Sequence, residues 1–299
     1  MNTDDLCNGK QRLTIELSHD GPSIWLVENG CTNDLMSMVS VWYRRPFVFD
    51  FRITDKIQRA AAESDLRHVL ESTWLLLGRK HWVDRPEAIA SARHKLLQQV
   101  VAASCGLTVP KTLVTNSSDK AKEFCSGPTV YKPIESYYYD YGEVWRETLT
   151  TLVDSELLSR IELVDRSPCQ FQRFVRKVAE CRVIWVGGRY FAIRLTGEGL
   201  EDAVDCRHRS VQGTLKSARV LLDTDTVAKL KATMSALGLV YGAIDLVESS
   251  AGDTVFLEVN PVGQWFSRDD QLNSEIATAI AATLLKGGEY DGDSGIGTC

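Results

Sequence analysis

The chain has 299 residues, of which 44% are hydrophobic and 25% are charged, and its formal net charge is −6. This composition is typical of a globular protein with a large core or two to three small domains, and the acidic balance gives no reason to expect nucleic-acid binding. No apolar run approaches the roughly 20 residues of a membrane span, and the N-terminus lacks the apolar core of a secretory signal, so we expect a cytoplasmic protein that does not bind membranes.

The first half of the chain predicts short strands followed by helices. Residues 13–17 alternate in polarity as in a half-buried strand, and the segments SIWLV and VSVWYRRP are typical of two more strands. Residues 54–77 have a helical pattern. A second helix is expected from Pro86, which suits a first helical turn, to Gly106, which suits the position after the last one.

The second half is richer in strands. We expect strands at VPKTLVTN, PTVYKP and CQFQRFV, a helix over 118–124, and a mobile loop at SYYYDYGEVWRE. The stretch ECRVIWVGGRYFAIRL predicts a hairpin that turns at Gly187-Gly188. A capped helix ending at Gly238, the strands VYGAIDLVES and TVFLEVNP, and a helix at SEIATAIAATLL follow.

The strand TVFLEVNP carries two polar side chains on one face. Glu258 and Asn260 are two residues apart, and strand side chains alternate with a period of two. If Ala251-Gly252 is a two-residue turn, Asp245 on the preceding strand lies opposite Glu258, about 5 Å away between Cβ atoms. Three oxygen ligands this close suit Mg²⁺ that shares its shell with phosphates. A pair of carboxylates on a solvated sheet face explains the spacing equally well.

Several cationic side chains could serve phosphates. Lys132 lies in an apolar strand, Lys95 in a helix, Arg182 and Arg194 on the two arms of the hairpin, and Arg207 in the glycine-containing segment beyond it. Each of these is also compatible with an ordinary surface charge.

Other common sites have no support in the sequence. There is no G-x-x-x-x-G-K-[ST] phosphate loop and no G-x-G-x-x-G fingerprint. The eight cysteines and five histidines are scattered without a C-x-x-C pair, so we expect reduced thiols and no zinc site.

Taken in chain order, the following segments match one known pattern: SVWYRRP, LLGRKHWVDRPEAIASARHKLLQQVVAASCGLTVPKTLVTN, VYKP, FQRFVRKVAECRVIWVGGRYFAIRL, DCRHR, YGAIDLV and VFLEVNPVGQW. The sequence resembles the ATP-grasp ligases, and within them the graspetide maturases, which crosslink side chains of microviridin-type ribosomal peptides. The resemblance implies an α/β (α+β) ATP-grasp fold that holds the nucleotide in a cleft between two α+β lobes.

The resemblance also implies a domain division. An N-terminal lobe would span 1–84, a central lobe 85–174, a C-terminal lobe 175–286 and a disordered tail 287–299. About 37 residues precede SVWYRRP, where family members usually have a full strand–helix–strand unit, so a shortened N-terminal lobe is expected.

The resemblance assigns roles to the candidate residues. ATP would be bound by Lys95, Lys132, the backbone of Gln172, Arg173, Phe174 and Val175, and Glu180. Two Mg²⁺ ions would be held by Asp245, Glu258 and Asn260. Arg194 would steady an acyl-phosphate, Arg182 and Arg207 would line the acceptor side, and the loop around 137–147 would close over the phosphates. Asp205 and His208 are weaker candidates for a general base than for structural salt bridges.

The implied reaction is ATP-dependent formation of ω-ester or ω-amide crosslinks. The Glu or Asp side chains of a ribosomal precursor peptide, with leader and core, would be phosphorylated and then attacked by Ser, Thr or Lys. Two alternatives stay open: a RimK-like ligase that adds amino acids to a protein or small acid, and a non-catalytic protein that binds nucleotide or leader peptide. Homodimerisation is left open too.

Overall fold

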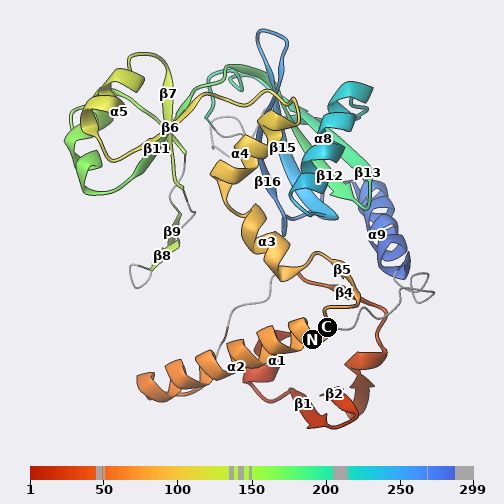
Figure 1. The fold of residues 1–299 in the computed structure, drawn as a ribbon. Helices are drawn as coiled ribbons and strands as arrows, with labels where there is room; N and C mark the ends of the chain where they lie inside the picture. The colour runs from red at the N-terminus through yellow and green to blue at the C-terminus, as the bar shows by residue number, and fades with distance from the viewer. Residues whose placement is uncertain are drawn as a thin grey trace. The chain divides into compact units, whose positions relative to one another are not determined.

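The computed structural model describes residues 1–44, 49, 51–134, 138–140, 145–147, 150–204, 215–267 and 269–286, with only the backbone at 138–140 and 145–147. The chain forms two compact units (Figure 1). Unit 1 contains Met1–Ala90, Leu239–Tyr241 and the chain from Phe266 onward, and unit 2 contains Ser91–Gly238 and Gly242–Trp265. Within these ranges, none of the helices is both long and apolar enough to cross a bilayer.

Unit 1 combines a three-stranded antiparallel sheet with helices and a parallel strand pair. Its elements are α1 (Thr3–Cys7), β1 (Gln11–Ser18), β2 (Gly21–Glu28), β3 (Cys31–Asp34), η1 (Leu35–Ser37), β4 (Ser40–Trp42), α2 (Lys56–Leu76), β5 (His81–Val83) and α9 (Asp270–Leu285). The helices predicted at 54–77 and at SEIATAIAATLL are confirmed. The core of this unit is built around the buried side chains of Leu70, Trp74, Leu77 and Trp82.

A buried carboxylate joins two segments of unit 1 that are far apart in sequence. Asp84, which is 2% exposed, accepts hydrogen bonds from the backbone N–H of Val240 at 2.5 Å and of Tyr241 at 3.0 Å. Burial raises the pKa of Asp84 to about 7 against the opposing effect of these two hydrogen bonds. The residue thus anchors the start of the strand that runs on into unit 2.

The first sheet of unit 2 has the order β10-β7-β11-β6, and its neighbouring strands are antiparallel. Its elements are β6 (Thr112–Thr115), α5 (Ser118–Phe124), β7 (Thr129–Lys132), β10 (Thr151–Leu152), α6 (Ser155–Leu158), η2 (Ile161–Arg166) and β11 (Cys169–Arg173). Phe124, Val164 and Phe171 pack in its core. The stretch expected to be a loop contains two short paired strands, β8 (Tyr138–Asp140) and β9 (Trp145–Glu147).

The second sheet of unit 2 has the order β14-β13-β12-β15-β16. Its elements are β12 (Lys177–Val186), β13 (Arg189–Thr196), β14 (Lys216–Val220), α8 (Thr224–Ala236), β15 (Tyr241–Ser249) and β16 (Thr254–Asn260). The predicted hairpin is confirmed, because Val186 pairs with Arg189 across Gly187 and Gly188, both of which have positive φ. The strand β16 is one of the two edge strands of this sheet.

The single helix predicted over 86–106 is wrong, because two helices occupy this stretch. The helix α3 (Pro86–Ala92) ends before Arg93, and α4 (Lys95–Ser104) begins after His94, which has an extended backbone with ψ of 99°. The Gln98 side chain donates to the carbonyl of Ala92 at 2.5 Å and so satisfies an acceptor that the break leaves open. As a result, Lys95 is the first residue of α4.

The turn expected between β15 and β16 is also wrong in its register. Glu248 pairs with Thr254, one residue away from the predicted alignment, and the N–H of Ser249 donates to the carbonyl of Asp253. A β-bulge then adds Leu257 to β16, which restores the predicted pairing of Asp245 with Glu258. The longer turn shifts the register by one residue, and the bulge shifts it back before Glu258.

Candidate active site

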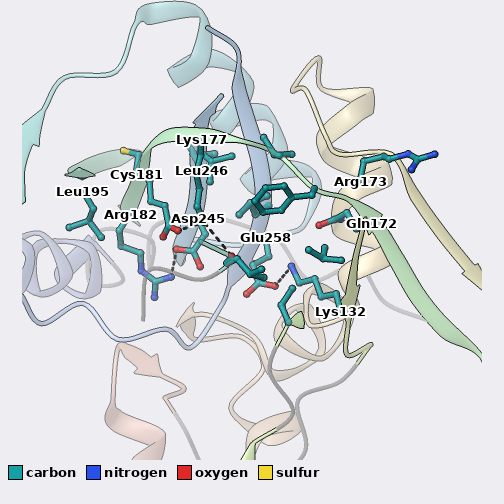
Figure 2. A pocket seen from close by; sticks show the side chains of 18 of the residues that line it. Lys132, Gln172, Arg173, Lys177, Cys181, Arg182, Leu195, Asp245, Leu246 and Glu258 are labelled. Atoms are coloured by element: carbon teal, nitrogen blue, oxygen red, sulfur yellow. Dashed lines mark hydrogen bonds and ion pairs between the residues drawn. The ribbon is translucent and has the colours of Figure 1, made fainter. Parts of the chain in front are cut away.

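Unit 2 contains a pocket of about 400 Å³ that residues of both its sheets line. Strand β7 contributes Lys132, and β11 with the segment after it contributes Gln172, Arg173, Phe174 and Val175. The second sheet contributes side chains of β12, β15 and β16 (Figure 2). Ten of the thirteen residues predicted to form the site line this pocket: Lys132, Gln172, Arg173, Phe174, Val175, Glu180, Arg182, Asp245, Glu258 and Asn260.

Asp245 and Glu258 lie on neighbouring strands and are direct partners in the antiparallel register. Directly opposed side chains point to the same face of a sheet. The bulge brings Asp245 and Glu258 into register, and both Leu257 and Glu258 line the pocket. Figure 2 shows the two carboxylates between Arg182 on one side and Lys132 on the other.

Glu258 is paired with two lysines. Its Oε2 atom lies 3.0 Å from Nζ of Lys132 and 3.6 Å from Nζ of Lys95. Burial by itself raises the pKa of Glu258, but Lys132 and Lys95 outweigh that effect and lower the pKa to about 2. Lys95 does not line the pocket, but this contact brings it to the same carboxylate.

Asp245 is paired with an arginine. Nη1 of Arg182 donates to its Oδ1 at 2.6 Å. Burial raises the pKa of Asp245, and the Arg182 guanidinium opposes the rise. A Cβ at Gly263 would lie 2.5 Å from Cβ of Ala243 and 3.2 Å from Nη2 of Arg182, so only glycine leaves room beside this pair.

Asn260 continues the polar face of β16. It is exposed and lines the pocket, and its Oδ1 accepts the N–H of Val262 at 3.1 Å. With Asp245 and Glu258 it forms a set of oxygen donors, which suits Mg²⁺. In the described ranges no group of three or more His, Cys, Asp or Glu side chains could hold a metal ion. A bound Mg²⁺ would therefore need further oxygens, such as those of phosphates or water.

The segment predicted to hold the adenine is partly engaged within the protein. The N–H groups of Arg173 and Phe174 donate to the carbonyls of Lys111 and Pro128 at 2.9 and 3.0 Å. Figure 2 shows the Arg173 side chain directed away from the two carboxylates. These two N–H groups are therefore not available to bind an adenine base. The predicted backbone contacts to adenine are left to the N–H of Val175 and to the carbonyl groups of the segment.

A buried ion pair at the pocket was missed by the sequence analysis. Nζ of Lys177 lies 2.5 Å from Oε1 of Glu180 and 3.2 Å from the carbonyl of Val204, and the Lys177 side chain is 4% exposed. The sequence carries no signal for it, because residues three apart lie on opposite faces of a regular strand.

The surroundings of Cys181 and Arg194 limit what each side chain can do. Cys181 lines the pocket, but burial, helped by the charge of Glu248, raises its pKa to about 12, so this thiol is not a nucleophile near neutral pH. Arg194 does not line it. Its Nε and Nη2 atoms donate to the two carboxylate oxygens of Glu248, each at 2.7 Å. Arg207, together with Asp205 and His208, lies outside the described residues.

Solved structures with the same fold cover nearly the whole chain. The macrocyclase MdnC from Microcystis aeruginosa MRC, bound with precursor peptide MdnA, has a TM-score of 0.81 and 25% identity over 96% of this chain and 90% of that one. MdnB from the same organism, also a macrocyclase, has a TM-score of 0.75 and 28% identity over 95% and 89%.

A third structure is a RiPP-associated ATP-grasp ligase from Chryseobacterium gregarium in complex with ADP, and a leader and core peptide. Its TM-score is 0.83, with 23% identity over 96% of this chain and 87% of that one. No family model matches the sequence, and no curated protein matches it significantly. Structure shared over almost the full length confirms the predicted ATP-grasp fold, and the structural relatives of the chain include macrocyclases and a RiPP-associated ATP-grasp ligase.

Proposed function

We propose that this protein is a ligase that uses ATP to crosslink the side chains of a ribosomal precursor peptide. The observation that carries the proposal is the opposed pair Asp245 and Glu258, each matched with a cation inside a pocket of an ATP-grasp fold. The structural relatives supply the substrate class, since MdnC was solved with a precursor peptide and the C. gregarium ligase with ADP, a leader and a core peptide.

The charged side chains of the pocket pair with one another without ligands, and each could pair with Mg²⁺ or with phosphate once ATP binds. Lys132 and Lys95 neutralise Glu258, and Arg182 neutralises Asp245. Asp245, Glu258 and Asn260 would hold Mg²⁺, which would supply charge neutralisation to the transferring phosphoryl group. The two lysines, which lie 3.0 and 3.6 Å from Glu258 before the ligands bind, would then bind phosphate oxygens.

The chemistry is a two-step condensation. A peptide carboxylate attacks the γ-phosphate of ATP, which gives an acyl-phosphate and ADP. A Ser or Thr hydroxyl, or a Lys amine, then attacks the acyl carbon, loses its proton, and expels phosphate. The cationic side chains stabilise the negative charge that develops on the transferring group. The peptide loses one water for each ester or amide formed.

Mass spectrometry distinguishes this proposal from its alternatives. The protein is incubated with ATP, Mg²⁺ and a short peptide encoded beside its gene that has a Thr/Glu/Asp-rich or Lys-rich core. We expect ADP release and the loss of one water per crosslink, and neither with Asp245→Asn. A gain in mass would indicate a RimK-like ligase that adds amino acids, and ATP binding without ADP release would indicate a non-catalytic binding protein.

A further inference from the structure

Helix α4 carries two adjacent glutamines that are both buried. Gln98 is 2% exposed and Gln99 is 7% exposed. Neighbouring residues of a helix project about 100° apart, so the two side chains reach different neighbours. Oε1 of Gln99 accepts from the hydroxyl of Thr112 on β6 at 2.8 Å, whereas Gln98 reaches β16 in the other sheet of unit 2.

Gln98 bonds the backbone of β16 as a neighbouring strand would. The N–H of Val259 donates to Oε1 of Gln98 at 2.9 Å, and Nε2 of Gln98 donates to the carbonyl of Val259 at 2.8 Å. β16 is an edge strand, and Val259 is 2% exposed, so these two backbone groups have no access to bulk water. Leaving them unpaired would cost more than the bonds themselves contribute, because a buried polar group loses its hydration.

The contacted residue lies in the middle of the candidate metal ligands. Val259 stands between Glu258 and Asn260, and Gln98 lies one helical turn after Lys95, whose Nζ is 3.6 Å from Glu258. The amide therefore sets the separation between the helix that carries a phosphate lysine and the strand that carries two ligands. An apolar side chain of the same size would fill the space but would leave the peptide unit of Val259 without these two hydrogen bonds.

We propose that Gln98 is a positioning residue that holds β16 in the geometry needed for Mg²⁺ and nucleotide. The inference rests on the proposed function, because it assumes that Glu258 and Asn260 hold the metal. In this proposal Gln98 contacts neither metal nor substrate. It acts through its two hydrogen bonds to the backbone of Val259 on β16.

The test compares Gln98→Met, which keeps the length of the side chain without its hydrogen bonds, with Val164→Ala. Val164 is buried in the separate core around Phe171, so its truncation loosens unit 2 without touching β16. Two quantities are measured in each protein: hydrogen exchange of the Val259 amide without ligand, and ADP affinity by calorimetry with and without Mg²⁺.

We expect Gln98→Met to expose the Val259 amide to exchange and to reduce the Mg²⁺-dependent gain in ADP affinity about tenfold, with ADP binding in the absence of Mg²⁺ within about twofold of wild type. Val164→Ala should leave both quantities unchanged. Equal Mg²⁺ dependence in Gln98→Met and wild type would overturn the inference, and so would an equal loss in Val164→Ala.

Two results separate the remaining cases. If the wild type shows no Mg²⁺-dependent ADP binding, the proposed function itself fails. If Gln98→Met does not fold, hydrogen exchange of the Val259 amide in the wild type tests the inference instead. Exchange as fast as that of an open edge strand would mean that Gln98 does not hold this amide.

Discussion

Replacing Glu258 by glutamine tests the electrostatics of the pocket directly. In the folded protein the pKa of Glu258 falls from its ordinary value of 4.5 to about 2, through Lys132 and Lys95. A carboxyl whose pKa is lowered on folding stabilises the protein above its unfolded pKa, and this contribution disappears as the pH falls through the folded pKa. The shift corresponds to about 3 kcal/mol at neutral pH.

Glutamine keeps the volume of the side chain but cannot ionise, so Glu258→Gln should lower the free energy of unfolding by about 3 kcal/mol at pH 7. By pH 3 the wild type should have lost about 2 kcal/mol of this advantage, because the affected window runs from pH 4.5 down to 2. ADP formation should be abolished, since an amide is a poorer ligand for Mg²⁺ than a carboxylate.

Urea unfolding of wild type and variant at pH 7 and pH 3 measures the effect, and the difference between the two proteins removes the contribution of other carboxyl groups. As a matched control, Glu248→Gln removes a carboxylate whose pKa Arg194 also lowers, but both side chains of that pair are 35% exposed. The control should cost less than about 1 kcal/mol. A wild-type advantage over Glu258→Gln that is the same at both pH values would refute the reasoning.

Two further substitutions test other parts of the molecule. Because burial raises the pKa of Asp84 to about 7, ionisation of this group should make the wild type lose stability as the pH rises from 3.8 to 7, by a few kcal/mol. Asp84→Asn should remove that slope in urea unfolding at pH 4, 5.5 and 8, and an unchanged slope would contradict the assignment. Gly263→Ala would place a Cβ 2.5 Å from Cβ of Ala243, so it should cost about 1–3 kcal/mol and weaken Mg²⁺-dependent ADP binding. If Gly263→Ala were as stable as the wild type and bound ADP equally well, position 263 would tolerate a side chain and the prediction would be wrong.

The pairing of each ligand carboxylate with a cation explains how the pocket can exist before its ligands bind. Two carboxylates on opposed strands would repel each other and raise each other's pKa. Lys132 and Lys95 on one side and Arg182 on the other offset that repulsion. The same cations are the groups that the proposed reaction needs for phosphates, so one set of charges stabilises the protein without ligand and would serve the substrate when it is bound.

Local sequence patterns predicted most elements of the site. Alternation with a period of two placed Glu258 and Asn260 on one face, and two glycines located the hairpin that carries Arg182 and Arg194. These features depend on residues that are close in sequence, where backbone geometry and turn chemistry have few solutions. The pairing of Asp245 with Glu258 was predicted for a wrong reason, because a three-residue turn and a bulge compensate each other.

Long-range contacts decided the rest. The break between α3 and α4 is stabilised where Gln98 meets both Ala92 and Val259, and Gln98 and Val259 are 161 residues apart in the chain. Another contact between distant residues is that of Arg194, which donates two hydrogen bonds to Glu248 and does not line the pocket. Periodicity and composition specify which face of an element is polar. Which buried polar group meets which partner is settled only when the sheets and helices pack, because each such group must find its hydrogen bonds in the folded protein.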